Sequence, residues 1–150
     1  MDDTFVMSIK KSIRLALKKA QKVVQIPPLD IVVMDDPKFV IPELGISGYA
    51  KNPTTIFVHV DPNSSHLINN LEQEVVSTIA HELHHVLRMS TVGYGKTLLE
   101  ALITEGLADH FDKELNQTLP KPWSISLKPD ELGFFSRLAI NEYNNTSYNH

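Results

Sequence analysis

The sequence predicts an α+β domain in which a helix and a small sheet are followed by further helices. Residues 4–24 carry apolar side chains at helical spacing, and short β-branched segments occupy residues 29–34 and 54–60. Helical periodicity then returns near residue 66 and continues, with interruptions, to residue 143. A chain of 150 residues with 42% hydrophobic content can form one core, so we expect a single domain over residues 1–150.

The first helix is expected over residues 4–24. Its apolar residues recur every fourth position, at Phe5, Ile9, Ile13 and Leu17. Asp3 or Thr4 is expected to cap its N-terminus, and Pro27-Pro28 to end it. Residues 29–34 then form a strand, and residues 48–50 and 54–60 form a hairpin around the turn Lys51-Asn52-Pro53. The predicted sheet is therefore small and mixed.

A second helix, expected from about residue 66 to about residue 90, contains the motif His81-Glu82-Leu83-His84-His85. Side chains four residues apart lie on one helix face, so His81 and His85 converge. The apolar residues of the segment lie roughly 120° to 240° from His81. They are Val75, Val76, Ile79, Leu83, Val86 and Leu87. One face of this helix is therefore core, and the other carries the histidines.

Two converging imidazoles predict a zinc site, because a catalytic zinc ion takes three His, Asp or Glu ligands and leaves its fourth position to water. The chain has no cysteine, which excludes thiolate ligands and disulfides. Glu82 lies roughly 100° from His81, at the border of the two faces. There it can reach a water on the metal without being a ligand, which is the position of a general base.

The third ligand is expected from the next helix, which opens at the capping box Thr97-Leu98-Leu99-Glu100. Glu105 and Asp109 are four residues apart and share one face. We expect Glu105 to bind zinc and Asp109 to accept the outer N–H of a ligating histidine. Gly106 is costly in a helix, which favours a close approach of the two helices there.

The helical geometry leaves one alternative open, because His84 lies about −60° and His85 about +40° from His81. At this point the residues resemble the gluzincin metallopeptidases, in which a glutamate on the following helix completes a helical His-Glu-x-x-His. The resemblance favours His85 as the ligand. It leaves His84 beside the ligands or lining the cleft, with a plain exposed histidine as the alternative.

A narrower resemblance is to a bacterial family of predicted zinc-dependent proteases of otherwise unknown function. It is carried by residues 81–85, the segment from Glu105 to Phe111 and the pair Pro122-Trp123, and it covers roughly residues 45–145. It implies a zincin-like fold. That family continues with a Gly-Tyr-rich helical segment, so we expect this sequence to be truncated at its C-terminus, with any catalytic group of such a tail outside it.

The function implied is zinc-dependent hydrolysis of peptide bonds in a peptide or protein substrate, with an edge strand that pairs with the substrate beside the cleft. A donor to the developing oxyanion is also needed. Tyr94 is our first choice, and the alternatives are Tyr49, His110 and Tyr143. A non-catalytic zinc-stabilised domain, a regulatory module with a vestigial site and a hydrolase of another amide remain alternatives.

The rest of the sequence limits the partners. A final helix over residues 129–143 places Leu132, Phe135, Leu138 and Ala139 on one side and is expected to pack on the domain. The net charge of −4 gives no support for nucleic-acid binding. No apolar run approaches the roughly 20 residues of a membrane span, and no secretory signal is visible, so a cytoplasmic location is expected. The sequence does not indicate an oligomeric state.

Overall fold

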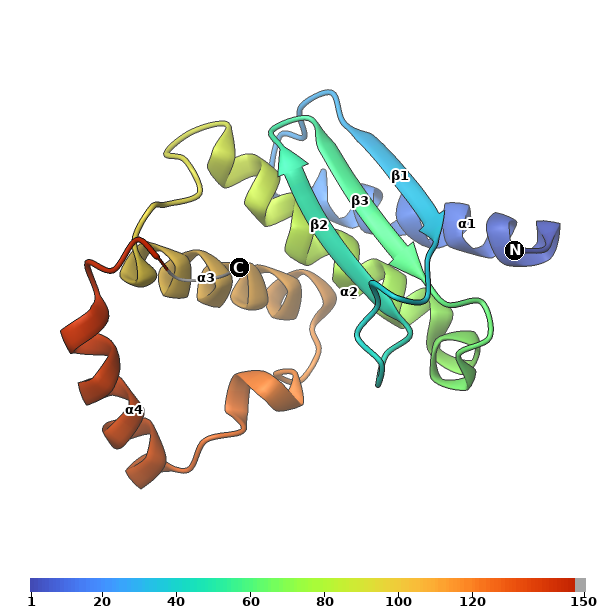
Figure 1. The fold of residues 1–150 in the computed structure, drawn as a ribbon. Coiled ribbons are helices and arrows are strands. Elements are labelled where there is room, and N and C mark those ends of the chain that lie inside the picture. Colours follow the sequence, from blue (N-terminus) through green and yellow to red (C-terminus); the bar gives the residue numbers. More distant parts are fainter. Residues whose placement is uncertain (148–150) are drawn as a thin grey trace.

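The fold is seen in a computed structural model, which describes residues 1–147, leaving aside the side chains of Pro122 and Trp123. The elements are α1 (Asp3–Ala20), β1 (Asp30–Asp35), β2 (Ile46–Asn52), β3 (Thr55–Val60), α2 (Ser65–Met89), α3 (Leu98–Asn116), the 3-10 helix η1 (Pro122–Ile125) and α4 (Pro129–Glu142). Helices α1 and α2 cover one face of the sheet, α3 lies beside α2, and α4 stands apart (Figure 1). The α+β class is confirmed.

The sheet has the strand order β1-β3-β2. β1 is parallel to β3 and β2 is antiparallel to it, so the sheet is mixed and β2 is an edge strand. The predicted hairpin is present, although β2 begins earlier than expected. Alternate residues of the central strand point at the helices and are fully buried: Ile56, Val58 and Val60.

The core lies between this sheet face and helices α1 and α2. The apolar stripe predicted for α2 is buried except for Leu87, which is only partly covered. Ile9 and Ala16 of α1 complete the same cluster. Burying this stripe fixes the rotation of α2 about its axis, because every apolar residue that turned outward would lose its burial energy. The opposite face of α2 is thereby directed away from the core.

Three local predictions were wrong. α1 ends at Ala20 and is capped by Asp2, whose Oδ1 accepts the Phe5 N–H at 2.8 Å, so neither Asp3 nor Thr4 is the cap. Gly106 lies on the exposed side of α3, where an added Cβ would meet nothing within 4 Å, so no close helix approach requires it.

The final helix forms where it was predicted but does not pack on the core. None of the α4 residues is buried, and Leu132, Phe135 and Leu138 are each about half exposed, at 55%, 49% and 49%. The connection over residues 117–128 leads α4 away from the sheet (Figure 1). The end of α4 and the chain after it meet the first residues of α3, where the Leu98 and Leu99 N–H groups donate to the Asn145 and Tyr143 carbonyls.

Within the part of the chain that the structure describes, no helix combines the length and the apolar character needed to cross a membrane.

Candidate metal centre

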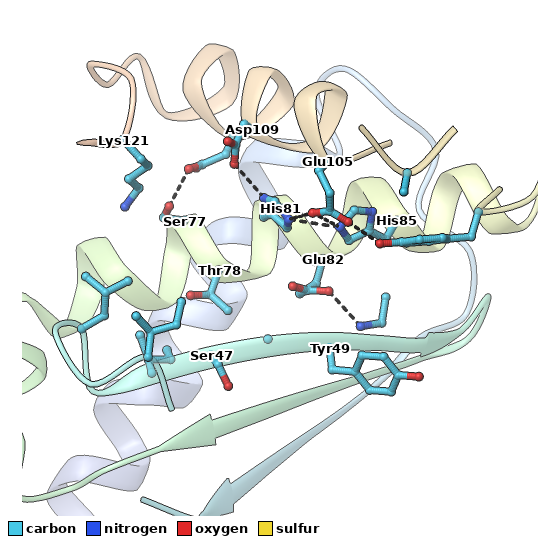
Figure 2. A pocket seen from close by; sticks show the side chains of 18 of the residues that line it. Ser47, Tyr49, Ser77, Thr78, His81, Glu82, His85, Glu105, Asp109 and Lys121 are labelled. Atoms are coloured by element: carbon cyan, nitrogen blue, oxygen red, sulfur yellow. Dashed lines mark hydrogen bonds and ion pairs between the residues drawn. The ribbon is translucent and has the colours of Figure 1, made fainter. Parts of the chain in front are cut away.

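Helices α2 and α3 are neighbours because only a short connection, residues 90–97, joins them. The capping box at the start of α3 is formed: Thr97 Oγ1 accepts the Glu100 N–H at 3.3 Å, and Glu100 Oε2 accepts the Thr97 N–H at 3.0 Å. This box fixes where α3 begins and hence which of its residues face α2. Figure 2 shows Glu105 and Asp109 of α3 facing His81 of α2.

Three side chains converge between the two helices. His81 Nε2 lies 3.0 Å from His85 Nε2 and 3.2 Å from Glu105 Oε2, and His85 Nε2 lies 3.4 Å from the same oxygen. One ligand atom of each residue lies within 4.8 Å of the other two. Two imidazoles and one carboxylate are a donor set that suits zinc, so the residues fit the metal that the sequence predicts.

Asp109 contacts the first histidine of this triad. Its Oδ1 lies 3.1 Å from His81 Nδ1, and its Oδ2 accepts a hydrogen bond from Ser124 Oγ at 2.5 Å. The hydrogen bond to His81 lowers the pKa of Asp109, so the carboxylate is ionised. Because Nδ1 is engaged in this way, Nε2 of His81 is directed at Glu105 and His85, as a ligand would need.

Electrostatics inside the triad favour charged groups. Burial opposes a charge on His81, but the hydrogen bonds to Asp109 and Glu105 outweigh it and raise the pKa of His81 to about 10. Burial likewise opposes ionisation of Glu105, yet contacts with His81, His85 and Tyr94 hold its pKa well below the usual range. His81 thus pairs with both carboxylates of α3 that face it, Glu105 and Asp109, across the two helices.

Glu82 lies between the triad and the sheet and is not one of the three converging side chains. Its side chain is 7% exposed, and its Oε2 accepts the N–H of Ala50 on β2 at 2.8 Å. Burial raises the pKa of this carboxyl. Gly48 lets the strand approach, because a Cβ there would lie 2.4 Å from Glu82 Cγ. Sequence reasoning missed both Gly48 and the Ala50 N–H, since neither belongs to a motif.

A cleft of about 770 Å³ runs past these groups between β2, α2 and α3. Tyr94 and Tyr49 line it, whereas His110 and Tyr143 do not. The Tyr94 hydroxyl donates to Glu105 Oε1, and the Tyr94 ring centroid lies 5.3 Å from that of His85. Of the proposed oxyanion donors, Tyr94 is therefore the one in contact with the triad.

His84 lies outside this cleft. It lines a separate pocket near the chain that follows α1, and its ring centroid is 6.2 Å from His85 and 5.9 Å from Phe111. Burial, together with the electrostatic influence of the neighbouring His85 and Arg88, lowers the pKa of His84 to about 4. His84 is therefore a neutral ring packed behind His85.

Comparisons with known proteins bear on the same residues. The chain is 32% identical over 111 residues to the uncharacterized protein YjfC of Bacillus subtilis (strain 168), an alignment that spans 71% of this chain and 35% of YjfC. The chain thus covers about a third of that relative's length. No solved structure matches this chain. The model of the family described as "Predicted Zn-dependent protease" (DUF2268) matches residues 8–150, and the chain belongs to this family.

Proposed function

We propose that this chain is a zinc-dependent peptidase that hydrolyses peptide bonds with Glu82 as general base. The observation that carries the proposal is the convergence of His81, His85 and Glu105 beside a buried carboxylate that is not part of the triad. A purely structural zinc site needs no such carboxylate and usually closes its fourth position with protein. Membership of a family described as predicted zinc-dependent proteases supports the same conclusion.

In the proposed mechanism His81, His85 and Glu105 would hold zinc, and Asp109 would keep His81 in the required orientation. When bound, zinc supplies the Lewis acidity that activates water and polarises the substrate carbonyl. Glu82 accepts the proton of the attacking water as the new C–O bond forms, then passes it to the amide nitrogen as the C–N bond breaks. Burial raises the pKa of Glu82, which suits a group that must both take and return a proton.

The substrate is proposed to be an extended peptide that pairs with the free edge of β2. The Ala50 N–H already points at the cleft, where it donates to Glu82. A strand added beside it would use main-chain hydrogen bonds for affinity and leave its side chains to enter the cleft. Tyr94 is the proposed donor to the oxyanion, and His84 is proposed to support the ring of His85 from behind.

The proposal is tested on protein purified without chelator. Elemental analysis should find about one zinc ion per chain, and mass spectrometry should detect cleavage of a mixed peptide library. A chelator should abolish cleavage and added zinc should restore it. Zinc without cleavage would favour a non-catalytic zinc-binding or regulatory domain, and a chain that takes up no zinc when it is supplied would exclude the peptidase.

Gly48→Ala should impair catalysis without removing the metal. The new Cβ would lie 2.4 Å from Glu82 Cγ and 2.7 Å from Glu82 Oε1, so the base must move. A displacement of about 1 Å in a reacting group can cost roughly 100-fold in rate, so kcat should fall by up to that factor. The matched control is Gly133→Ala in α4, where the nearest atom is 3.6 Å away. Unchanged hydrolysis by Gly48→Ala would show that Glu82 need not be held where it lies.

A further inference from the structure

One end of the cleft carries a charged pair that the proposed mechanism does not use. Glu74 of α2 is 4% exposed, and its Oε2 lies 3.4 Å from Lys121 Nζ. Its other oxygen lies 3.1 Å from His66 Nε2. Glu74 and Lys121 line the same cleft as the metal triad, and Figure 2 shows Lys121 beyond Ser77, on the side of His81 away from His85.

The two partners of this pair differ in how they are held. Glu74 belongs to the long helix α2, whose core face is fully packed. Lys121 belongs to the irregular connection between α3 and η1, which leaves α3 through Gln117 in the left-handed conformation, with φ at 52°. Leu119 in this connection is 87% exposed. The carboxylate is thus a fixed part of the cleft wall, whereas the ammonium reaches in from an irregular segment, with the Lys121 side chain 17% exposed.

Because the Glu74 carboxylate is buried, it selects for positive charge in any group that replaces Lys121. A buried charge that loses its partner is strongly destabilising, because it has lost its hydration as well. Exchange of Lys121 for another cation therefore keeps the Glu74 carboxylate compensated, whereas loss of Lys121 alone does not. A neutral or anionic group cannot make that exchange.

The surroundings favour a cation as well. Asp112 of α3, 4% exposed, lines the same end of the cleft and accepts hydrogen bonds from Ser77 at 2.5 Å and from Asn116 at 2.7 Å. Carboxylates of Glu74, Asp109 and Asp112 line this end together with the ammonium of Lys121, whereas Lys51, the other lysine among the described lining residues, lies near the far end of β2. An incoming positive charge therefore meets a field that attracts it.

The direction of β2 indicates which part of a substrate would arrive here. Gly45, just before β2, approaches Leu67 near the start of α2, whereas Ala50 contacts Glu82 further along, so β2 and α2 run the same way. Glu74 therefore lies toward the beginning of β2. A peptide added antiparallel to β2, the more stable sense of pairing, would direct the residues after its cleaved bond to this end.

We propose that this end of the cleft is a subsite for a basic substrate side chain located after the cleaved bond. Glu74 is its specificity-determining residue, and Lys121 occupies the place of the substrate's positive group in the free protein. This inference rests on the proposed peptidase function. It adds to that function a preference for peptides with lysine or arginine at one position.

The first test measures binding in the absence of metal and of turnover. NMR titrations of metal-free protein compare Nα-acetyl-lysine amide with Nα-acetyl-norleucine amide, which has the same stem without the charge. Lys121→Ala removes the ammonium that occupies the subsite in the free protein. In this variant the lysine probe should bind about 10-fold more tightly than the norleucine probe, as expected for one charged hydrogen bond. Adding Glu74→Gln should remove this difference. Lys113→Ala, an exposed lysine on α3, is the control for loss of charge.

The wild-type chain gives the same ranking at higher probe concentration, so the test does not depend on how well the variants fold. Equal binding of the two probes, or a lysine preference that survives Glu74→Gln, would overturn the subsite. In the zinc-loaded protein, cleavage of the peptide library should favour a basic residue after the cleaved bond, and Glu74→Gln should lose this bias. A chain that ranks the probes as expected but cleaves nothing would support the subsite and contradict the peptidase.

Discussion

Glu82→Gln is expected to lower peptide hydrolysis by about 10²- to 10⁴-fold, the usual contribution of a general base. Glutamine has nearly the same shape but cannot accept a proton. Its side-chain oxygen can still accept the Ala50 N–H, so the contact between α2 and β2 should survive. Because Glu82 lies outside the triad of His81, His85 and Glu105, the variant should keep about one zinc ion per chain. Elemental analysis and initial rates on one protein preparation measure both.

The matched control for this variant is Glu72→Gln. It makes the same chemical change on the same helix, at a side chain that is 57% exposed and pairs only loosely with Lys11, 3.8 Å away. Its rate and zinc content should equal those of the unmodified chain. If Glu82→Gln lost its zinc, Glu82 would be a ligand. If it kept both zinc and activity, a group other than Glu82 would have to accept the proton of the attacking water.

The side-chain positions that the sequence predicted and the structure reproduces are those in which the relevant residues interact within one helix or across a short connection. His81 and His85 converge because they are one helical turn apart, whatever the rest of the chain does. The position of Glu105 needed one further step, the capping box at Thr97, which fixes the phase of α3. Both steps use only local geometry, and local geometry is what a sequence pattern encodes.

The features that sequence reasoning missed depend on contacts between distant segments. Glu82 was placed correctly on α2, but its contact with Ala50 follows from β2 being the edge strand in the order β1-β3-β2, which no periodicity encodes. Lys121 and Ser124 reach the site from an irregular connection. Such a segment has no hydrophobic periodicity from which the position of a side chain could be predicted.

The predicted packing of α4 failed for a related reason. The amphipathic pattern correctly indicates an apolar helix face, but it does not say what covers that face. In the structure those side chains are about half exposed. Gly106 shows the opposite error. A residue that is unfavourable in a helix was interpreted as evidence of a close contact between helices, whereas the space around it is open.

Glu105→Ala is expected to weaken zinc binding by more than the roughly 10- to 100-fold that loss of an orienting partner costs. Glu105 supplies the only carboxylate of the triad, and its Oε2 lies 3.2 Å and 3.4 Å from the two histidine nitrogens. Alanine leaves two ligands where a catalytic zinc ion needs three. Competition against a chromophoric chelator measures the affinity. Asp109→Asn should fall within the smaller range, because it weakens only the orientation of His81.

The melting temperature separates loss of the ligand from loss of the fold. Zinc that binds only the folded chain stabilises it by mass action, so added zinc should raise the melting temperature of the unmodified protein. Glu105→Ala should show almost no such rise and should otherwise melt as a cooperative unit, since this side chain is exposed and outside the core. Glu114→Ala, another exposed glutamate of α3, should respond to zinc as the unmodified chain does. An undiminished response in Glu105→Ala would mean that the third ligand comes from another residue, and that α3 approaches α2 for reasons of packing alone.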